Sequence, residues 1–102
     1  MTTITPEELK ARMDAGAEVH LVDVREPSEN AVYNIGGILL PVGQIMAMQT
    51  DAIDHLKDKE VIFYCRSGVR SANAAQFAET MGFTQTVNLT GGMLAWQDKF
   101  GG

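Results

Sequence analysis

Hydrophobic and polar positions follow two different periods along this chain, and their order predicts an α/β architecture. Four short apolar segments have the length and continuity of buried strands: 19–24, 38–40, 61–64 and 86–89. Four longer segments carry apolar residues at helical spacing: 6–15, 43–56, 71–81 and 93–99. Because strands and helices alternate, we expect a three-layer domain whose central, mainly parallel sheet has about four or five strands and is flanked by helices.

Several residues sharpen these predicted elements. Thr5 and Glu8 have the spacing of a capping box around Pro6, which predicts where the first helix begins. In the predicted helix over 43–56, the apolar side includes Met46 and Met48, which we expect to fill the core. Trp96 is expected to anchor the last helix in the core.

Length and composition narrow the class of protein. A chain of 102 residues is expected to form a single domain, 1–102. Its net charge of −5 argues against nucleic acid and acidic membranes as partners. No apolar run is long enough to span a bilayer, no signal peptide is visible, and one cysteine cannot form an internal disulfide. These features favour a cytoplasmic setting, although a leader removed earlier would leave the same sequence.

The single cysteine lies at the most informative place in the chain. Cys65 follows the apolar segment 61–64 and precedes a predicted helix, so backbone N–H groups without helical partners converge near its sulfur. The loop also supplies two arginines, two hydroxyls and a glycine that permits a tight turn: Arg66, Arg70, Ser67, Ser71 and Gly68. Positive charge and N–H donors lower the pKa of a thiol, which makes Cys65 a candidate nucleophile.

Other interpretations of this loop are open from the residues alone. A lone cysteine is often a small buried hydrophobe, the arginines could be solvated surface residues, and the loop could bind an anion without chemistry. Motifs for other kinds of chemistry are missing from the sequence. It contains no Cys-x-x-Cys redox pair, no phosphate-binding lysine loop and no dinucleotide-binding glycine pattern. His20 and His55 do not form a zinc set, so we expect no metal and no cofactor.

Three motifs together resemble the single-domain rhodaneses, which are thiosulfate or related sulfurtransferases. The segment 21–26 (LVDVRE) resembles the early strand motif of that family. The loop 65–71 (CRSGVRS) resembles its catalytic loop, and 91–96 (GGMLAW) resembles its C-terminal Gly-Gly-x-x-x-Trp segment. The order and spacing of the motifs fit, and the resemblance covers essentially the whole chain.

The resemblance implies a mechanism and a set of site residues. Cys65 would take a sulfane sulfur from a small anionic, thiosulfate-like donor, and a thiol, cyanide or a thiol-bearing protein would accept it. The donor and the persulfide would be bound by the loop residues Arg66, Ser67, Gly68, Val69, Arg70 and Ser71. Arg70 is the first choice for binding the anion and Arg66 the second. Asp23 and Arg25 would support the surrounding loops and take no part in the chemistry.

One segment departs from the family pattern, and several functions stay open. The family usually has a His-Ile-x-Gly-Ala segment, whereas Asn34 replaces the histidine here and the stretch 34–41 is one residue shorter. We therefore expect a reshaped wall and an altered donor preference. The alternatives to a sulfurtransferase are a protein-to-protein sulfur carrier, a non-catalytic binding module of the same fold, and a phosphatase or arsenate reductase. Related phosphatase loops resemble this one but are one residue longer.

Overall fold

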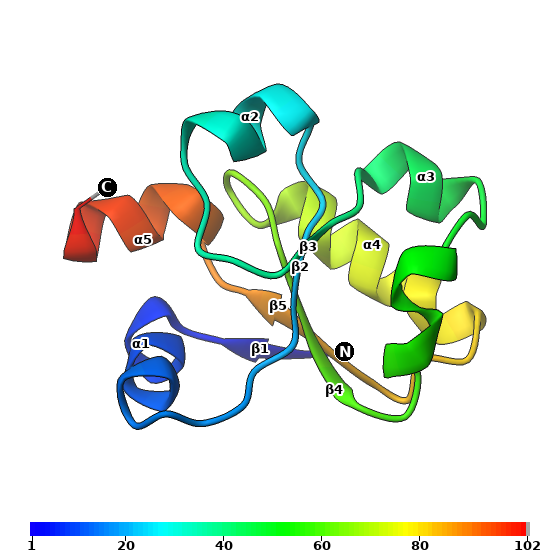
Figure 1. Ribbon diagram of the computed structural model, residues 1–102, viewed down its shortest axis with the longest axis horizontal. Coiled ribbons are helices and arrows are strands. Elements are labelled where there is room, and N and C mark those ends of the chain that lie inside the picture. Colours follow the sequence, from blue (N-terminus) through cyan, green and yellow to red (C-terminus); the bar gives the residue numbers. More distant parts are fainter. Residues whose placement is uncertain (102) are drawn as a thin grey trace.

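The computed structural model describes residues 1–101 as one parallel sheet with helices on both faces (Figure 1). Within that range the strand order is β1-β5-β4-β2-β3, and every neighbouring pair is parallel. The strands are Thr2–Ile4 (β1), Leu21–Asp23 (β2), Ile38–Leu39 (β3), Glu60–Tyr64 (β4) and Gln85–Leu89 (β5). The predicted α/β architecture is confirmed, and the sheet has the upper of the two expected strand numbers.

Helices cover the two faces of this sheet in separate groups. The helices are Pro6–Asp14 (α1), Pro27–Val32 (α2), Val42–Met46 (α3), Val69–Thr80 (α4) and Gly92–Phe100 (α5), with a 3₁₀ helix at Asp51–Leu56 (η1). Helices α1 and α5 pack on one face, and α3, η1 and α4 pack on the other (Figure 1). The short α2 lies beyond the end of β2, above the edge of the sheet where the strands end.

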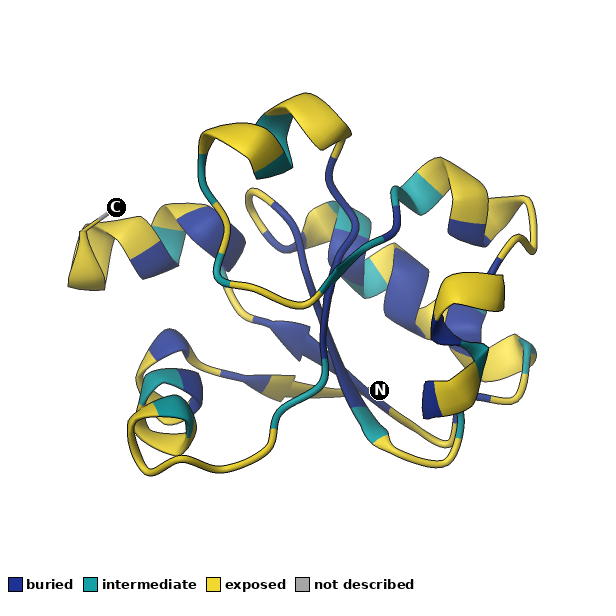
Figure 2. Cartoon of the chain, in the orientation of Figure 1, coloured by how far each residue is buried: buried dark blue, intermediate teal, exposed yellow. Residues whose placement is uncertain are grey.

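Alternation along the strands explains how one short sheet supports two cores. In β4, Val61 and Phe63 face the α4 side, whereas Ile62 and Tyr64 face the α1 and α5 side. All four residues are fully buried, and β4 is dark blue along most of its length in Figure 2. A strand buried on both faces needs apolar residues at every position, which is why these strands read as continuous apolar runs.

The start of α1 agrees with its sequence pattern. The Thr5 hydroxyl accepts a hydrogen bond from the Glu8 amide at 3.1 Å, and the Glu8 carboxylate accepts one from the Thr5 amide at 3.0 Å. Strand β1, by contrast, was not expected. Of its three residues only Ile4 is buried, so the segment carries too little apolar pattern to mark it as a strand.

The prediction of a single helix over 43–56 was wrong. Helix α3 ends at Met46, Met48 adopts a left-handed φ of 62°, and η1 begins only at Asp51. A residue in the left-handed region cannot continue a right-handed helix, so the segment splits in two. Met46 and Met48 are 42% and 68% exposed, so they do not fill the core. The core positions in this segment are Ile45, Ile53 and Leu56.

The remaining helices agree with the predicted ones to within a few residues. Trp96 of α5 is buried, as expected. None of the helices formed by residues 1–101 combines the length and the apolar character that a bilayer crossing requires.

Candidate active site

Three polar residues meet at the edge of the sheet where the parallel strands end. Asp23 closes β2, Cys65 directly follows β4, and Asn88 lies near the end of β5. The strand register pairs Asp23 with Tyr64 and Phe63 with Asn88, which places these residues side by side. Ligands of open α/β sheets bind at this edge, so it is the natural location for a site.

The sulfur of Cys65 lies inside the loop that connects β4 to α4. Its Sγ accepts hydrogen bonds from the amides of Gly68 at 3.1 Å and Ser71 at 3.3 Å, and the Ser71 hydroxyl lies at 3.3 Å. Gly68 makes this curl possible because its φ of 99° is in the left-handed region. The loop thus aims donors inward at the sulfur, as the sequence predicted, although among residues 66–71 only Gly68 and Ser71 form hydrogen bonds to Sγ.

These contacts affect the pKa of the Cys65 thiol. Burial of Cys65 raises the pKa of its thiol, but the hydrogen bonds from Ser71 and Gly68 outweigh that effect and lower the pKa from its usual value. The side chain is fully buried, and a thiolate rather than a thiol is the nucleophilic form of cysteine. The lowered pKa therefore favours the form of Cys65 that is a nucleophile.

Arg70 forms an ion pair that the sequence did not suggest. Its two terminal nitrogens donate to the two carboxylate oxygens of Glu29 in α2, at 2.9 and 3.0 Å. This hydrogen-bonded contact lowers the pKa of Glu29 to about 2. The pair ties α2 to the beginning of α4, and it neutralises the arginine that we ranked first for binding an anion.

Arg66 is the more available cation at this site. Its side chain is exposed and forms no hydrogen bond or ion pair with the part of the chain that the structure describes. It borders a hollow of about 260 Å³ between α2 and α5, together with Tyr33 and Leu94. Arg70 does not line this hollow. The side chain of Val69 is 66% exposed and forms no part of the lining of this hollow.

Asp23 and Arg25 form a closed network at the end of β2. The Arg25 guanidinium donates to both carboxylate oxygens of Asp23, at 2.9 and 2.8 Å, and to the carbonyl oxygen of Tyr33 at 2.7 Å. Asn30 donates to the same carboxylate at 2.9 Å. Both charged residues are buried, and their contacts hold the segment after α2 against the sheet. Their supporting role stays a prediction that these contacts make specific.

The sequence missed three residues that contact the loop or its arginine. Glu29 pairs with Arg70, and Asn88 donates to the Gly68 carbonyl oxygen at 3.1 Å. Gly92 adopts a φ of 56°, and a Cβ at this position would collide with the carbonyl oxygens of Cys65 and Arg66. Asn88 was detectable, because it follows a predicted strand that ends at the same edge as Cys65. The contacts of Glu29 and Gly92 depend on tertiary placement.

The altered segment 34–41 forms its own turn. Asn34 accepts a hydrogen bond from the Gly36 amide at 2.9 Å and donates to the Asn30 carbonyl oxygen at 3.0 Å. The Tyr64 hydroxyl donates to the Gly36 carbonyl oxygen at 2.8 Å, and burial of Tyr64 raises its pKa to about 12. The Asn34 side chain is therefore used to close the turn, and its effect on donor preference stays a prediction.

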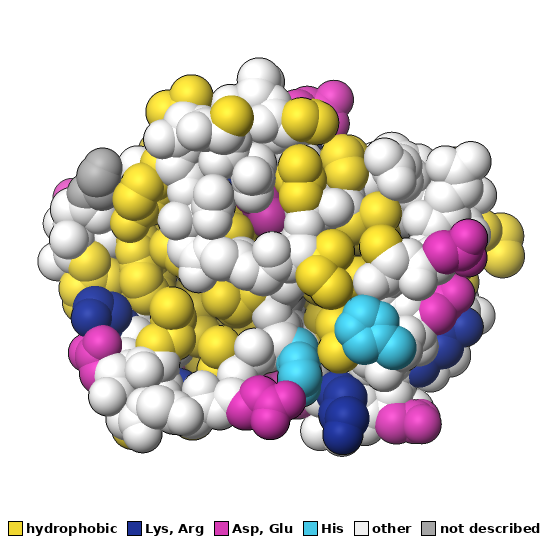
Figure 3. All heavy atoms as spheres, viewed as in Figure 1, with side chains coloured by type: hydrophobic (Ala, Val, Ile, Leu, Met, Phe, Trp, Pro, Cys, Tyr) yellow, Lys and Arg dark blue, Asp and Glu magenta, His cyan; other side chains and the backbone are white. Residues whose placement is uncertain are grey.

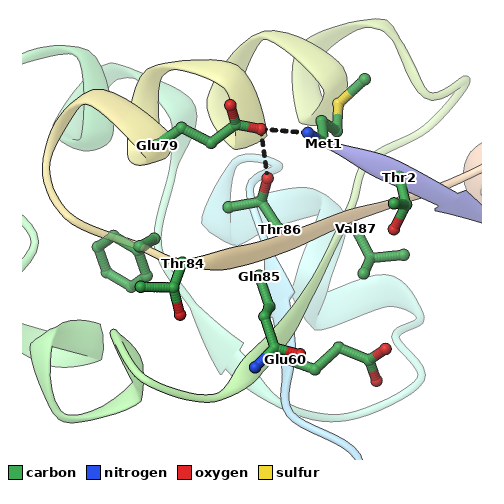
Figure 4. Close-up of a pocket in the computed structure, with 9 residues that line it drawn as sticks. Met1, Thr2, Glu60, Glu79, Thr84, Gln85, Thr86 and Val87 are labelled. Carbon is green, nitrogen blue, oxygen red and sulfur yellow. Dashed lines mark hydrogen bonds and ion pairs between the residues drawn. The ribbon is translucent and has the colours of Figure 1, made fainter.

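Two other regions do not share the chemistry of this edge. A larger hollow, about 490 Å³, lies at the opposite edge, where β4 and β5 begin, and Figure 4 shows Glu79 there between the N-terminus and Thr86. It contains neither the thiol nor an arginine. The histidine side chains lie on the surface seen in Figure 3. No group of three or more metal-ligating side chains occurs among residues 1–101.

Comparison with known proteins agrees with this geometry. The Rhodanese-like domain family model matches residues 5–99. The putative sulfurtransferase YtwF of Bacillus subtilis is 40% identical over 92 residues, which cover 89% of this chain and 85% of that protein. The human thiosulfate:glutathione sulfurtransferase is 28% identical, with 95% of this chain and 94% of that protein covered. Two longer mycobacterial relatives are 36% identical over 95 residues, and the chain spans only 24% of their length.

Solved structures give the same result. The crystal structure of a rhodanese-like domain protein from Staphylococcus aureus has a TM-score of 0.81 and 33% sequence identity, and the match covers 94% of this chain and 91% of that one. The family match extends over nearly the whole chain, from the capping residue of α1 to the last turn of α5. The chain therefore belongs to the rhodanese-like domain family.

Proposed function

We propose that this protein is a sulfurtransferase in which Cys65 carries the transferred sulfur as a persulfide. The observation that supports this most directly is the loop after β4, where a buried sulfur accepts hydrogen bonds from Gly68 and Ser71. The same donors that stabilise a thiolate would stabilise the negative charge of a persulfide. Relatives named as sulfurtransferases support sulfur transfer in general, and the identity of donor and acceptor belongs to the proposal.

The reaction would proceed in two displacements that need no redox partner. The Cys65 thiolate attacks the outer sulfur of thiosulfate, the sulfur–sulfur bond of the donor breaks, and sulfite leaves with the bonding electron pair. Cys65 then carries a persulfide with one negative charge. In the second step a thiolate or cyanide attacks the outer sulfur, and the Cys65 thiolate leaves and is regenerated.

The donor we propose is a small anion of the thiosulfate type. Arg66 is exposed beside the loop and is free to attract such an anion, whereas Arg70 is held by Glu29. The acceptor we propose is a thiol or, in the assay, cyanide. A thiol-bearing protein as acceptor would make the chain a sulfur carrier, with thiosulfate serving as a surrogate donor.

Loop length favours sulfur over phosphorus as the reacting centre. Four residues separate Cys65 from Arg70, and each residue spans at most about 3.3–3.6 Å. The Gly68 and Ser71 amides already lie within hydrogen-bond distance of Sγ, which leaves little room for the three outer oxygens of a phosphate. Cleavage of a phosphate ester also needs a general acid, and the loop itself contains neither aspartate nor histidine.

A paired assay tests this choice. The unmodified protein and Cys65→Ser would be compared for thiosulfate:cyanide sulfur transfer and for hydrolysis of an aryl phosphate, with melting curves as the control for folding. We expect sulfur transfer by the unmodified protein alone and negligible phosphate hydrolysis by either. Phosphatase turnover that is lost in Cys65→Ser would assign the loop to phosphorus chemistry instead.

A further inference from the structure

Asn88 is a buried polar side chain that touches the loop at two points. Its Nδ2 donates to the Gly68 carbonyl oxygen at 3.1 Å, and its Oδ1 accepts from the Ser71 hydroxyl at 2.5 Å. The orientation of the amide is fixed by the first contact, because a carbonyl oxygen can only accept and so must face the NH₂ group. The oxygen that faces Ser71 is therefore an acceptor with no hydrogen of its own.

The Ser71 hydroxyl consequently faces two acceptors with a single hydrogen. Asn88 Oδ1 lies 2.5 Å from the hydroxyl oxygen, and Cys65 Sγ lies 3.3 Å from it. All three side chains are buried, so solvent supplies no substitute donor at this point. Whatever share of the hydrogen bond goes to Asn88 is withdrawn from the sulfur.

Resting on the proposed function, we propose that Asn88 is a positioning residue that competes with the Cys65 sulfur for the Ser71 hydroxyl hydrogen and thereby keeps the sulfur strongly nucleophilic. A thiolate that receives a full extra hydrogen bond is easier to form but reacts more slowly, because nucleophilicity falls with basicity. The amides of Gly68 and Ser71 are fixed by the backbone, so the rotatable hydroxyl is the adjustable donor.

The charged groups around the sulfur would not obscure this effect. Arg70 on α4 is paired with Glu29 on α2, and Arg66 in the loop is exposed. At the end of β2, Asp23 and Arg25 neutralise one another. Asn88 and Ser71 carry no charge, so replacing them with uncharged residues leaves all of these groups in place.

The test measures the rate at which iodoacetamide alkylates Cys65 as a function of pH in four proteins: the unmodified chain, Asn88→Leu, Ser71→Ala and the double variant. Competition predicts that Asn88→Leu moves the inflection of the rate–pH curve to lower pH, because the Ser71 hydroxyl then donates its hydrogen to the Cys65 sulfur alone. The plateau rate should fall about threefold for each pH unit of that shift. Ser71→Ala should move the inflection upward, and Asn88→Leu should have no further effect in the Ser71→Ala background.

A merely structural role for Asn88 predicts a different pattern. Loss of support for Gly68 would weaken the amide donors, so the inflection would move upward or stay, and the effect would persist without the Ser71 hydroxyl. Either result overturns the proposal. Asn88→Ala, which is smaller, is measured in the same two backgrounds, and loss of folding in both Asn88 variants would also contradict it. Alkylation needs no sulfur donor, so absent sulfur transfer with the expected alkylation pattern would refute only the proposed function.

Discussion

The ends of β2 and β4 lie next to each other at one edge of the sheet, yet their polar side chains have different kinds of partners. At the end of β2, the buried Asp23 carboxylate is matched by the Arg25 guanidinium and by Asn30, so its charge is balanced. At the end of β4, the Cys65 sulfur receives two backbone amides, and no cation forms a bond to it within residues 1–101. The negative charge of Asp23 is neutralised by side chains, whereas negative charge on the Cys65 sulfur would be stabilised by backbone N–H dipoles.

This difference separates a group that holds the structure together from one suited to chemistry. A carboxylate in a closed ion pair gains nothing by meeting a ligand, because its partners would have to be displaced. A thiolate held by two fixed amides and the Ser71 hydroxyl has no counter-ion to displace, and under the proposed function the same amides would stabilise the persulfide. We therefore expect substitutions at the two strand ends to affect activity and stability in opposite proportions.

The largest effect on activity is expected at Cys65. Cys65→Ser replaces the sulfur with an oxygen that cannot form a persulfide, so sulfur transfer from thiosulfate to cyanide should be abolished. The free energy of unfolding should change little because the hydroxyl is nearly the same size. Turnover assays and denaturant curves on the same preparation check both parts. Residual turnover at the level of the unmodified protein would remove Cys65 from the mechanism.

The largest effect on stability is expected at Asp23. Asp23→Ala leaves the Arg25 guanidinium buried without its anion, and breaking a buried pair in this way costs about 3–5 kcal/mol of unfolding free energy. Asp14→Ala is the matched control, since Asp14 is in an exposed pair with Lys10 and should change stability by less than about 0.5 kcal/mol. Equal losses in the two variants would show that the buried network does not support the fold.

Gly92 connects α5 to the reactive strand end. Gly92→Ala combines backbone strain, which costs about 1–3 kcal/mol, with a collision against the carbonyl oxygens of Cys65 and Arg66, so we expect a stability loss larger than that of strain alone and slower sulfur transfer. Gly16→Ala has a similar φ of 76° but open space around the added carbon, so it reports strain alone. Only the Gly92 variant should slow turnover, and equal kinetics in the two would argue against a link between α5 and the loop.

Substitutions of the two arginines should distinguish a residue that binds the sulfur donor from one that stabilises the fold. Arg66→Ala should raise the KM for thiosulfate about tenfold, which is the scale of one lost charge-assisted contact. Arg70→Ala should affect KM less and stability more, because Arg70 is occupied by Glu29. Steady-state kinetics at constant ionic strength, with melting curves, distinguish them. A larger KM effect at Arg70 would restore the ranking that the sequence suggested.

The smallest effect concerns the pH dependence of the Glu29–Arg70 pair. The pKa of Glu29 falls from an ordinary 4.5 to about 2 in the folded protein. Its stabilising contribution is therefore full above pH 4.5 and is lost as the pH falls through about 2. Because both side chains are partly exposed, we expect about 0.2–1 kcal/mol between the unmodified protein and Glu29→Gln at pH 7. Denaturant curves at pH 7 and pH 3 should show a smaller difference at pH 3, and a larger one there would contradict the assignment.

The sequence predicted the parts of this molecule that local pattern controls. The apolar runs of β2 and β4, the capping box at Thr5 and the loop around Cys65 all depend on neighbouring residues, and each was recognisable. The segment 43–56 was misread because a left-handed residue at Met48 breaks a pattern that otherwise suits one helix. Strand β1 exists only through its pairing with β5, which no local pattern indicates.

In the candidate site, too, the contacts between residues near in sequence could be predicted, and those between distant residues could not. Cys65 and its donors lie within seven residues of sequence and could be predicted together. Glu29 reaches Arg70 across 41 residues, and Asn88 reaches Gly68 across 20. Such contacts are set by how the strands are ordered in the sheet, so the pairing of Arg70 with Glu29 could not be read from the loop alone.

The intact mass of the protein after brief exposure to thiosulfate tests the central claim most directly. If the amides at the end of β4 stabilise a persulfide, the unmodified chain should gain the mass of one sulfur atom, and cyanide should remove it. Cys65→Ser should gain nothing, and Asp23→Asn, where it folds, should still gain one. An unmodified chain that is folded and reduced yet gains no sulfur, or a Cys65→Ser chain that does, would contradict persulfide formation at Cys65.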